Sequence, residues 1–156
     1  KGVAVDSDEI VYVADEGNHA IRRVTPTGVV TTLAGSSVGG WRDGTGTSAR
    51  FLNPSAVTLD GLGYMYVADT DNYVIRKIEL STGSVITFAG RNGTYGIADG
   101  YGTNALFARP QGIAVDLLGF IYVADTDSHT IRRCNPAGFV STLAGQANIH
   151  GNGAVD

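Results

Sequence analysis

Three stretches of this chain carry almost the same residues: VYVADEGNHAIR at 11–22, MYVADTDNYVIR at 65–76 and IYVADTDSHTIR at 121–132. Their aspartates Asp15, Asp69 and Asp125 lie 54 and 56 residues apart. A fixed period of this size indicates one supersecondary unit copied in tandem, with each copy burying its apolar face on the next. The repeat, and not any single residue, therefore predicts the fold.

Within the third copy, four short runs of apolar and β-branched residues are separated by turns: GIAVD at 112–116, FIYVA at 120–124, HTIRRC at 129–134 and FVSTLA at 139–144. Each run has the usual length of a strand. The segments between the runs are rich in Asp, Ser, Asn, Pro and Gly, which favour tight turns. The pattern predicts a four-stranded antiparallel meander with hairpin connections.

The other two copies have the same order, with predicted strands at 2–6, 10–14, 19–24, 29–34, 56–60, 64–68, 73–78 and 84–89. Long Gly-rich connections lie between the copies, and both contain a related pattern, DGTGTSARF at 43–51 and DGYGTNALF at 99–107. Because the pattern recurs, we expect ordered loops. Phe51 and Phe107 are predicted to anchor them by burying an aromatic ring, which is worth roughly 2–3 kcal/mol each.

Four-stranded sheets repeated in tandem are the units of a β-propeller. We therefore predict an all-β propeller segment of three four-stranded antiparallel blades, with a repeat near 55 residues, that this chain alone does not close. The predicted organisation is blade 1 at 1–35, a Gly-rich inter-blade loop at 36–53, blade 2 at 54–90, a second loop at 91–109, blade 3 at 110–145 and the start of a next loop at 146–156.

The repeat also predicts that the flanks of the segment are covered. Asp156 stands where Asp43 and Asp99 stand, and Lys1 aligns with Gln111, so we expect a chain cut inside a repeat at both ends. A propeller typically needs four to eight blades. Burying an exposed blade face of ~1000 Å² contributes on the order of 25 kcal/mol gross. This contribution is comparable with the ~5–15 kcal/mol net stability of a domain. The expected partners are further blades, from a longer polypeptide or from copies of the chain, with a filament as the end-to-end form.

Composition excludes several classes of function. The chain has 156 residues, 43% of them apolar, and 11 basic against 15 acidic side chains, a net charge of -4. This balance gives no electrostatic footprint for nucleic acid or for an anionic membrane, and no apolar run is long enough to span a bilayer. The single cysteine, Cys134, excludes an internal disulfide and a cysteine-rich metal site. It aligns with Val24 and Ile78, so we expect a buried small hydrophobe.

The motifs GIAVD at 112–116, IYVADTDSHTIR at 121–132, STLAG at 141–145 and the loop DGYGTNALFARP at 99–110 carry a family resemblance. The chain resembles the NHL repeat family over nearly its whole length, in three copies. The resemblance implies a β-propeller. It implies no single function, because relatives of this type include RNA-binding domains, protein-interaction modules, extracellular adhesion proteins and a peptide-amidating lyase.

Each copy carries an aspartate and an arginine seven residues apart: Asp15 and Arg22, Asp69 and Arg76, Asp125 and Arg132. The end of the second strand and the middle of the third can face each other across a hairpin. We expect a charge-assisted hydrogen bond there or to the adjacent blade, with ligand binding as the alternative. In the family these are signature positions, which favours the structural interpretation.

Other polar residues suggest chemistry only superficially. His19 and His129 occupy a position where the middle copy has Tyr73, which is not the pattern of a metal site. The Asp-Gly loops at 43–46 and 99–102 lack the ordered carboxylates of a calcium loop and the Gly-Lys-Ser/Thr ending of a phosphate loop, so we interpret them as turns. The acidic segment 6–9 is interpreted as a solvated hairpin tip, with weak calcium binding as the alternative. We assign no catalytic, cofactor-binding or metal residue and expect no cofactor.

Two loop residues are candidates for contacts or modification. Trp41, in a Gly-rich loop, is either a contact anchor or a packing plug. Asn92-Gly93-Thr94 matches the acceptor triplet for N-linked glycosylation.

Together these features favour a non-enzymatic NHL-type propeller that serves as a scaffold, a protein-interaction module or a self-assembling structural module. The copies differ little, whereas a small-molecule site usually needs asymmetry. One alternative is a fragment of a six-bladed propeller enzyme or sensor, lyase-like, whose active residues lie in missing blades. A minor alternative is an RNA-binding NHL domain. We expect protein partners, and neither nucleic acid nor membrane; the compartment stays open.

Overall fold

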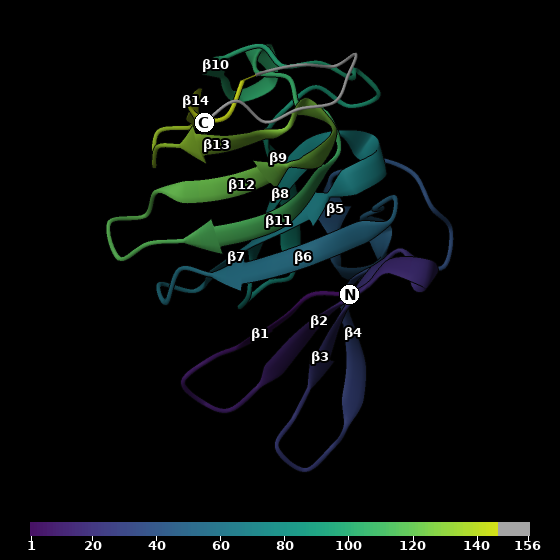
Figure 1. Ribbon diagram of the computed structural model, residues 1–156. Coiled ribbons are helices and arrows are strands. Elements are labelled where there is room, and N and C mark those ends of the chain that lie inside the picture. The colour runs from purple at the N-terminus through teal and green to yellow at the C-terminus, as the bar shows by residue number, and fades with distance from the viewer. Residues whose placement is uncertain (147–156) are drawn as a thin grey trace.

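The computed structural model describes residues 1–146, which form three antiparallel sheets in chain order (Figure 1). Sheet one contains β1 (Val3–Val5), β2 (Val11–Asp15), β3 (Ala20–Val24) and β4 (Val30–Gly35). Sheet two contains β6 (Pro54–Leu59), β7 (Tyr64–Asp69), β8 (Val74–Glu79) and β9 (Ser84–Ala89). Sheet three contains β11 (Pro110–Val115), β12 (Ile121–Asp125), β13 (Thr130–Cys134) and β14 (Phe139–Ala144). The predicted all-β meanders are confirmed, and none of the three sheets closes on itself.

The two long connections each add a strand that the sequence did not predict. β5 (Gly44–Thr45) pairs with β9, and β10 (Gly100–Tyr101) pairs with β14, so sheets two and three have five strands where four were expected. Both additions are two residues long, too short to show the alternation that marks a strand in a sequence. They cover the outer edges of β9 and β14, whose backbone would otherwise be unpaired.

A tight 3-10 turn joins the second and third strands of each sheet, at Glu16–Asn18, Thr70–Asn72 and Thr126–Ser128. The residue after each turn has a left-handed backbone: φ is 51° at His19, 59° at Tyr73 and 57° at His129. Its N–H donates to the carbonyl of the first residue of the turn. All three copies thus hold a residue other than glycine in a left-handed conformation at this position.

One glycine of each repeat permits a close approach between the third and fourth strands. Gly90 has a φ of +93°, and a Cβ there would lie 2.6 Å from the Tyr73 carbonyl oxygen and 2.9 Å from Val74 Cα. Gly35 is equivalent, with 2.5 Å to the His19 carbonyl oxygen. The pairing register shifts beside this contact, between Ile75 and Arg76 in sheet two. A side chain at either glycine would force the two strands apart.

Alternate residues of a strand point to opposite sides of its sheet, which gives each sheet a face A and a face B. Face A carries a Tyr, an Ala and an Ile at equivalent positions: Tyr12, Ala14 and Ile21 in sheet one, Tyr66, Ala68 and Ile75 in sheet two, and Tyr122, Ala124 and Ile131 in sheet three. Face B carries mostly branched apolar side chains: Val11, Val13 and Val24 in sheet one, Met65, Val67 and Ile78 in sheet two, and Ile121, Val123 and Cys134 in sheet three.

The core consists of two apolar clusters, each between neighbouring sheets. The first joins face A of sheet one to face B of sheet two, and the second joins face A of sheet two to face B of sheet three. Phe51 and Phe107, each 0% exposed, come from the long connections and complete one cluster each. Within residues 1–146, no helix is long and apolar enough to cross a membrane. The sequence predicts a further loop at 146–156, and residues 147–156 of it lie outside the described residues.

Candidate functional site

The repeated Asp–Arg pair forms a buried node in sheet two. Arg76 Nη1 donates to Asp69 Oδ2 at 2.9 Å, and both side chains are 0% exposed. The guanidinium also donates to three groups of the preceding long connection, the Arg50 carbonyl at 2.9 Å, the Arg42 carbonyl at 3.0 Å and Asp43 Oδ1 at 2.7 Å. Asp43, which the sequence indicated only as a turn residue, is therefore an ion-pair partner. One arginine fixes the connection to the sheet.

The same node recurs in sheet three around Arg132. Its Nη2 donates to the Ala98 carbonyl at 3.0 Å and to Asp99 Oδ1 at 2.7 Å, and its Nη1 donates to the Leu106 carbonyl at 2.9 Å. Asp125 Oδ2 lies 3.6 Å from Arg132 Nη1, an ion pair slightly longer than a hydrogen bond. The recurrence shows that this is a property of the repeat.

The buried phenylalanine of each connection packs beneath its arginine. The Arg76 guanidinium carbon lies 5.1 Å from the centre of the Phe51 ring, and that of Arg132 lies 5.4 Å from Phe107. In the described part of the chain, the Nε atoms of these two arginines are the only buried side-chain nitrogen or oxygen atoms without a hydrogen-bond partner. The aromatic face supplies electrostatic stabilisation to the cation instead.

Sheet one carries a half-exposed version of the node. Arg22 Nε donates to Asp15 Oδ2 at 2.8 Å, and Nη1 donates to Thr32 Oγ1. The Arg22 side chain is 32% exposed, and among residues 1–146 its hydrogen bonds and ion pair involve no residue of a long connection. The same sequence motif therefore occurs once near solvent and twice in the interior.

The pKa values of the repeated aspartates shift in opposite directions, upward in the interior and downward near solvent. It raises the pKa of Asp69 to about 6, although the donors around the carboxylate favour its charged form. Burial raises the pKa of Asp125 to about 6 for the same reason. In sheet one, the hydrogen bond from Arg22 lowers the pKa of Asp15 below its ordinary value. Water near Asp15 reduces the desolvation cost that dominates in the interior.

A pH series on Asp69→Asn tests the cause of this raised pKa. The folded pKa of Asp69 is about 6 against an ordinary value of 3.8, so its contribution to stability is present below pH 4 and is lost as the pH rises through 6. We expect the free energy of unfolding of the unmodified chain, relative to Asp69→Asn, to fall by on the order of 3 kcal/mol between pH 4 and pH 7. Urea denaturation at each pH measures it. A difference that grows with pH would show that the Arg76 charge outweighs burial.

Face A of sheet three is not covered by the described chain. Ile131 is 40% exposed, whereas its equivalents Ile21 and Ile75 are 0% exposed. A shallow apolar hollow of about 280 Å³ lies on this face, between β11, β12 and β13, with Tyr122 and Ala124 in its lining. Residues 1–146 therefore leave uncovered in sheet three the surface that fills a core cluster in sheets one and two.

Face B of sheet one is the second uncovered surface. Val30 is 60% exposed, whereas its equivalents Val85 and Val140 are 1% and 0% exposed. Six valines lie on this face beside Arg22 and Thr32: Val3, Val5, Val11, Val13, Val24 and Val30. The two uncovered faces are thus of opposite kinds, one A and one B.

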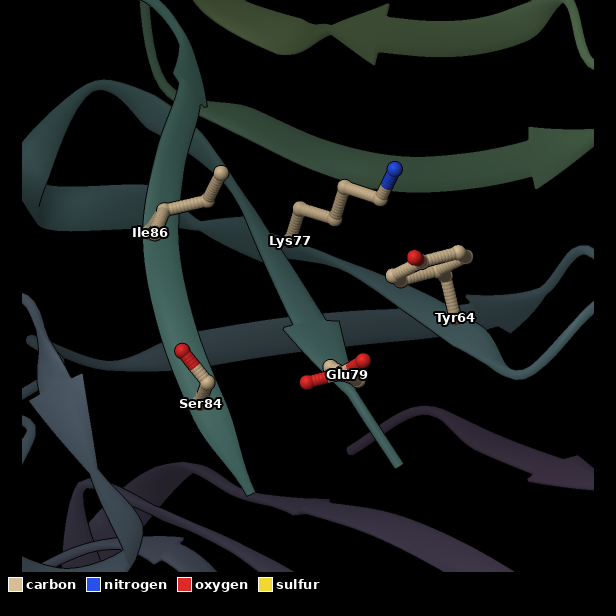
Figure 2. Close-up of a pocket in the computed structure, with 5 residues that line it drawn as sticks. All are labelled: Tyr64, Lys77, Glu79, Ser84 and Ile86. Carbon is tan, nitrogen blue, oxygen red and sulfur yellow. The ribbon is translucent and has the colours of Figure 1, made fainter. Parts of the chain in front are cut away.

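A small hollow of about 270 Å³ lies on face A of sheet two (Figure 2). It is lined by Tyr64, Lys77, Glu79, Ser84 and Ile86. Lys77 Nζ lies 3.7 Å from the centre of the Tyr64 ring, and Glu79 accepts a hydrogen bond of 2.6 Å from Thr82 Oγ1. Glu79 stands where the other copies have Thr25 and Asn135, so the repeats differ more here than the sequence analysis indicated.

The remaining predicted positions lie apart from one another. Trp41 is 43% exposed, and its Nε1 donates to Thr87 Oγ1 at 3.0 Å, so it contacts β9 while keeping an accessible surface. Asn92 is exposed in a turn. Cys134 is buried, and burial raises the pKa of its thiol to about 12.

A repeated aspartate turn was missed by the sequence analysis. Asp6, Asp60 and Asp116 each accept two backbone N–H bonds with one carboxylate oxygen, at 2.7 to 3.0 Å, and thereby close the hairpin between the first two strands. The signal was their recurrence at the repeat spacing. The Asp6 carboxylate is therefore occupied within the protein. Within residues 1–146, no group of three or more His, Cys, Asp or Glu side chains could hold a metal ion.

Comparison with known proteins identifies the repeat. The family model of the NHL repeat matches residues 1–24 and 107–134. These two segments are NHL repeats. The chain is 37% identical over 83 residues to the protein SUPPRESSOR OF QUENCHING 1, chloroplastic, of Arabidopsis thaliana. The aligned segment covers 53% of this chain and 8% of that protein. The chain is 38% identical over 89 residues to NHL repeat-containing protein 2 of Gallus gallus, covering 56% and 12%. The chain thus matches a small part of these relatives.

Solved structures give the fold. A structural genomics protein of unknown function from Bacteroides thetaiotaomicron superposes with a TM-score of 0.71 and 26% identity, over 85% of this chain and 32% of that one. Virginiamycin B lyase from Staphylococcus aureus superposes with a TM-score of 0.62 and 15% identity, over 91% and 40%. The likeness to the lyase shows the fold alone. The predicted class, an open segment of a β-propeller, is confirmed.

Proposed function

We propose that this NHL-repeat chain is a non-enzymatic propeller scaffold whose flanking sheets bind further blades, including those of its own copies. The observation that carries the proposal is the pair of uncovered faces. Face A of sheet three and face B of sheet one are the two halves of an interface that the chain buries twice in its own core. Removing apolar surface of this kind from water lowers the free energy of the assembled protein.

The long connections support a role in protein contacts. Arg76 and Arg132 hold them against the sheets, so their exposed side chains have little freedom to lose on binding. Three exposed aromatic residues lie on them: Trp41, Tyr95 and Tyr101. Tyr and Trp are over-represented among residues that dominate protein interfaces.

Two alternatives from the sequence gain less support. The lyase alternative rests on likeness of fold, which does not transfer an activity. RNA binding would need a positive surface, but Arg76 and Arg132 are fully buried. The neighbouring Lys77 and Arg133 lie over aromatic rings of their own sheets, and the chain has a net charge of -4.

Self-association of the purified chain tests the scaffold proposal. We expect size-exclusion chromatography with light scattering to give a particle mass above that of one chain, because burial of the two uncovered apolar faces outweighs the entropy of association. A concentration series separates stable association from weak encounter. A monodisperse single chain at every concentration would contradict the proposal that copies of the chain bind one another.

A further inference from the structure

We propose that the hollow on face A of sheet two binds a small dipolar ligand, an α-amino acid with an apolar side chain. Lys77 binds the carboxylate of this ligand, Glu79 binds its ammonium group, and Ile86 contacts its side chain. Such a site goes beyond the proposed scaffold function and does not depend on it. It follows from the position of the hollow, from the residues that set sheet two apart from the other copies, and from the two opposite charges in the lining.

The hollow has a fixed position on its sheet. Tyr64, Glu79 and Ser84 stand opposite one another across β7, β8 and β9, and Lys77 stands opposite Ile86 one step further along. Because alternate residues of a strand share a side, all five side chains lie on face A. Figure 2 shows them around a common space, with Lys77 and Ile86 at one end and Glu79 and Ser84 at the other. The uncovered faces of sheets one and three take no part in it.

Two residues of the hollow distinguish sheet two from its copies. Ser84 stands where sheet one has Val29 and sheet three has Phe139, so a small side chain leaves space that larger ones occupy. Glu79 stands where the other copies have uncharged residues. The fold of a sheet requires neither residue, since the other two sheets form without them. The copies therefore differ at the one place where a small ligand finds both room and an acidic group.

Lys77 supplies the positive end of the hollow. Its Nζ lies 3.7 Å from the centre of the Tyr64 ring. Among residues 1–146 this ammonium group forms no ion pair. It has three N–H donors, and a ring face contacts only one side of a cation. The half-buried side chain therefore keeps hydrogen-bond donors for an anion in the hollow.

Glu79 supplies the negative end. Thr82 Oγ1 donates to its Oε2 at 2.6 Å, and Oε1 accepts no hydrogen bond from the part of the chain that the structure describes. Glu79 follows Lys77 by two residues on β8, a separation of roughly 6–7 Å between their Cα atoms in a strand. A ligand that carries a carboxylate and an ammonium group can satisfy both side chains at once. A simple anion would bind Lys77 but would be repelled by Glu79.

The size of the hollow and its apolar wall limit the ligand further. The volume of about 270 Å³ lies below the roughly 300–1,000 Å³ of sites that hold drug-sized molecules. Ile86 is 51% exposed at the end that also holds Lys77, so a ligand gains by covering it with an apolar group. An amino acid such as leucine combines one carboxylate, one ammonium group and a branched apolar side chain.

Titration with L-leucine, followed in the amide NMR spectrum of the isotope-labelled chain, tests the proposal. We expect saturable shifts at the amides of β8 and β9 that border the hollow, and none in sheet one. Two analogues separate the charges on the unmodified chain: N-acetyl-L-leucine lacks the ammonium group, and L-leucinamide lacks the carboxylate. Each should bind about 10-fold more weakly than L-leucine or worse, because each loses a hydrogen bond to a charged side chain.

Variants assign the two charges to their residues. Glu79→Gln should bind L-leucine and N-acetyl-L-leucine equally, and Lys77→Met should bind L-leucine and L-leucinamide equally, since each variant lacks the charge that distinguishes the two ligands. Ser84→Phe introduces the residue that sheet three has at this place and should abolish binding by filling the hollow. Arg133→Met changes the residue equivalent to Lys77 in sheet three and is the matched control, with binding unchanged. Circular dichroism checks the fold of each variant.

Each result supports or overturns the site. Absence of saturable shifts with L-leucine up to its solubility limit overturns it. Equal binding of L-leucine and either analogue by the unmodified chain overturns the assignment of charges, and binding that Ser84→Phe leaves intact places the ligand outside the hollow. Self-association, which tests the scaffold function, involves none of these side chains, so the two proposals fail separately.

Discussion

Arg76→Met is expected to lower the free energy of unfolding by about 3–5 kcal/mol, because it removes one member of a fully buried ion pair. Methionine keeps an unbranched apolar side chain at this position but has no hydrogen-bond donor. Asp69 then loses its 2.9 Å partner in the interior. The carbonyl oxygens of Arg42 and Arg50 lose the hydrogen bonds that Arg76 donates to them. This loss is comparable with the net stability of many domains, which is ~5–15 kcal/mol.

Arg22→Met is the matched control, since Arg22 holds the equivalent place in sheet one. Its pair with Asp15 is partly solvated, and exposed pairs contribute about 0–1 kcal/mol. Urea denaturation of both variants at pH 7.5, where the carboxylates are charged, gives the comparison. Equal losses of unfolding free energy in the two variants would contradict this expectation. They would mean that the arginine stabilises the protein only through its hairpin and that its contacts to the long connection contribute nothing.

A second readout locates the effect. Arg76 contacts the connection at 36–53, so hydrogen exchange of the amides in that connection should accelerate in Arg76→Met before the strands of sheet two open. In Arg22→Met the same amides should exchange as in the unmodified chain. Uniform acceleration over all three sheets would point to global destabilisation without a special role for the connection.

The periodic features were predictable from the sequence because each rests on a local rule. Strand positions follow from runs of β-branched and aromatic residues between turns. The spacing of seven puts Asp69 and Arg76 on the same face of the hairpin, as diagonal neighbours on adjacent strands. The sequence could not show the rest of the node. Backbone carbonyls such as those of Arg42 and Arg50 carry no residue signature, and their position depends on how an 18-residue connection folds back over a sheet.

The assignment of faces also needed the structure. Alternation predicts that each strand has two sides, but both sides of sheets two and three are apolar, so the pattern alone does not reveal which side meets which neighbour. The exposure of Ile131 and Val30, set against the buried Ile75 and Val85, resolves this. The aspartate turns at Asp6, Asp60 and Asp116 were within reach of the sequence, because they recur at the repeat spacing.

Phe107→Ala is expected to lower the free energy of unfolding by about 3–5 kcal/mol, the usual cost of truncating a buried phenylalanine. Phe107 is 0% exposed and fills the cluster between sheets two and three. Its ring also lies beneath the Arg132 guanidinium, so truncation leaves a cavity beside a buried cation whose Nε has no hydrogen-bond partner. The cost exceeds the roughly 2–3 kcal/mol of simple burial by the amount of this cavity.

Tyr101→Ala is the control from the same connection. Tyr101 is 60% exposed and packs its ring on Phe139 at 4.8 Å, so its loss should cost about 1 kcal/mol or less. Urea denaturation measures both variants, and hydrogen exchange follows the amides of Leu106 and Ala108, which bond to the Ala98 carbonyl and to Asp125. If Phe107 anchors the connection, these amides lose protection in Phe107→Ala and keep it in Tyr101→Ala. Retained protection in both variants would place the anchor in the Arg132 node alone, with the ring serving only as filling of the core.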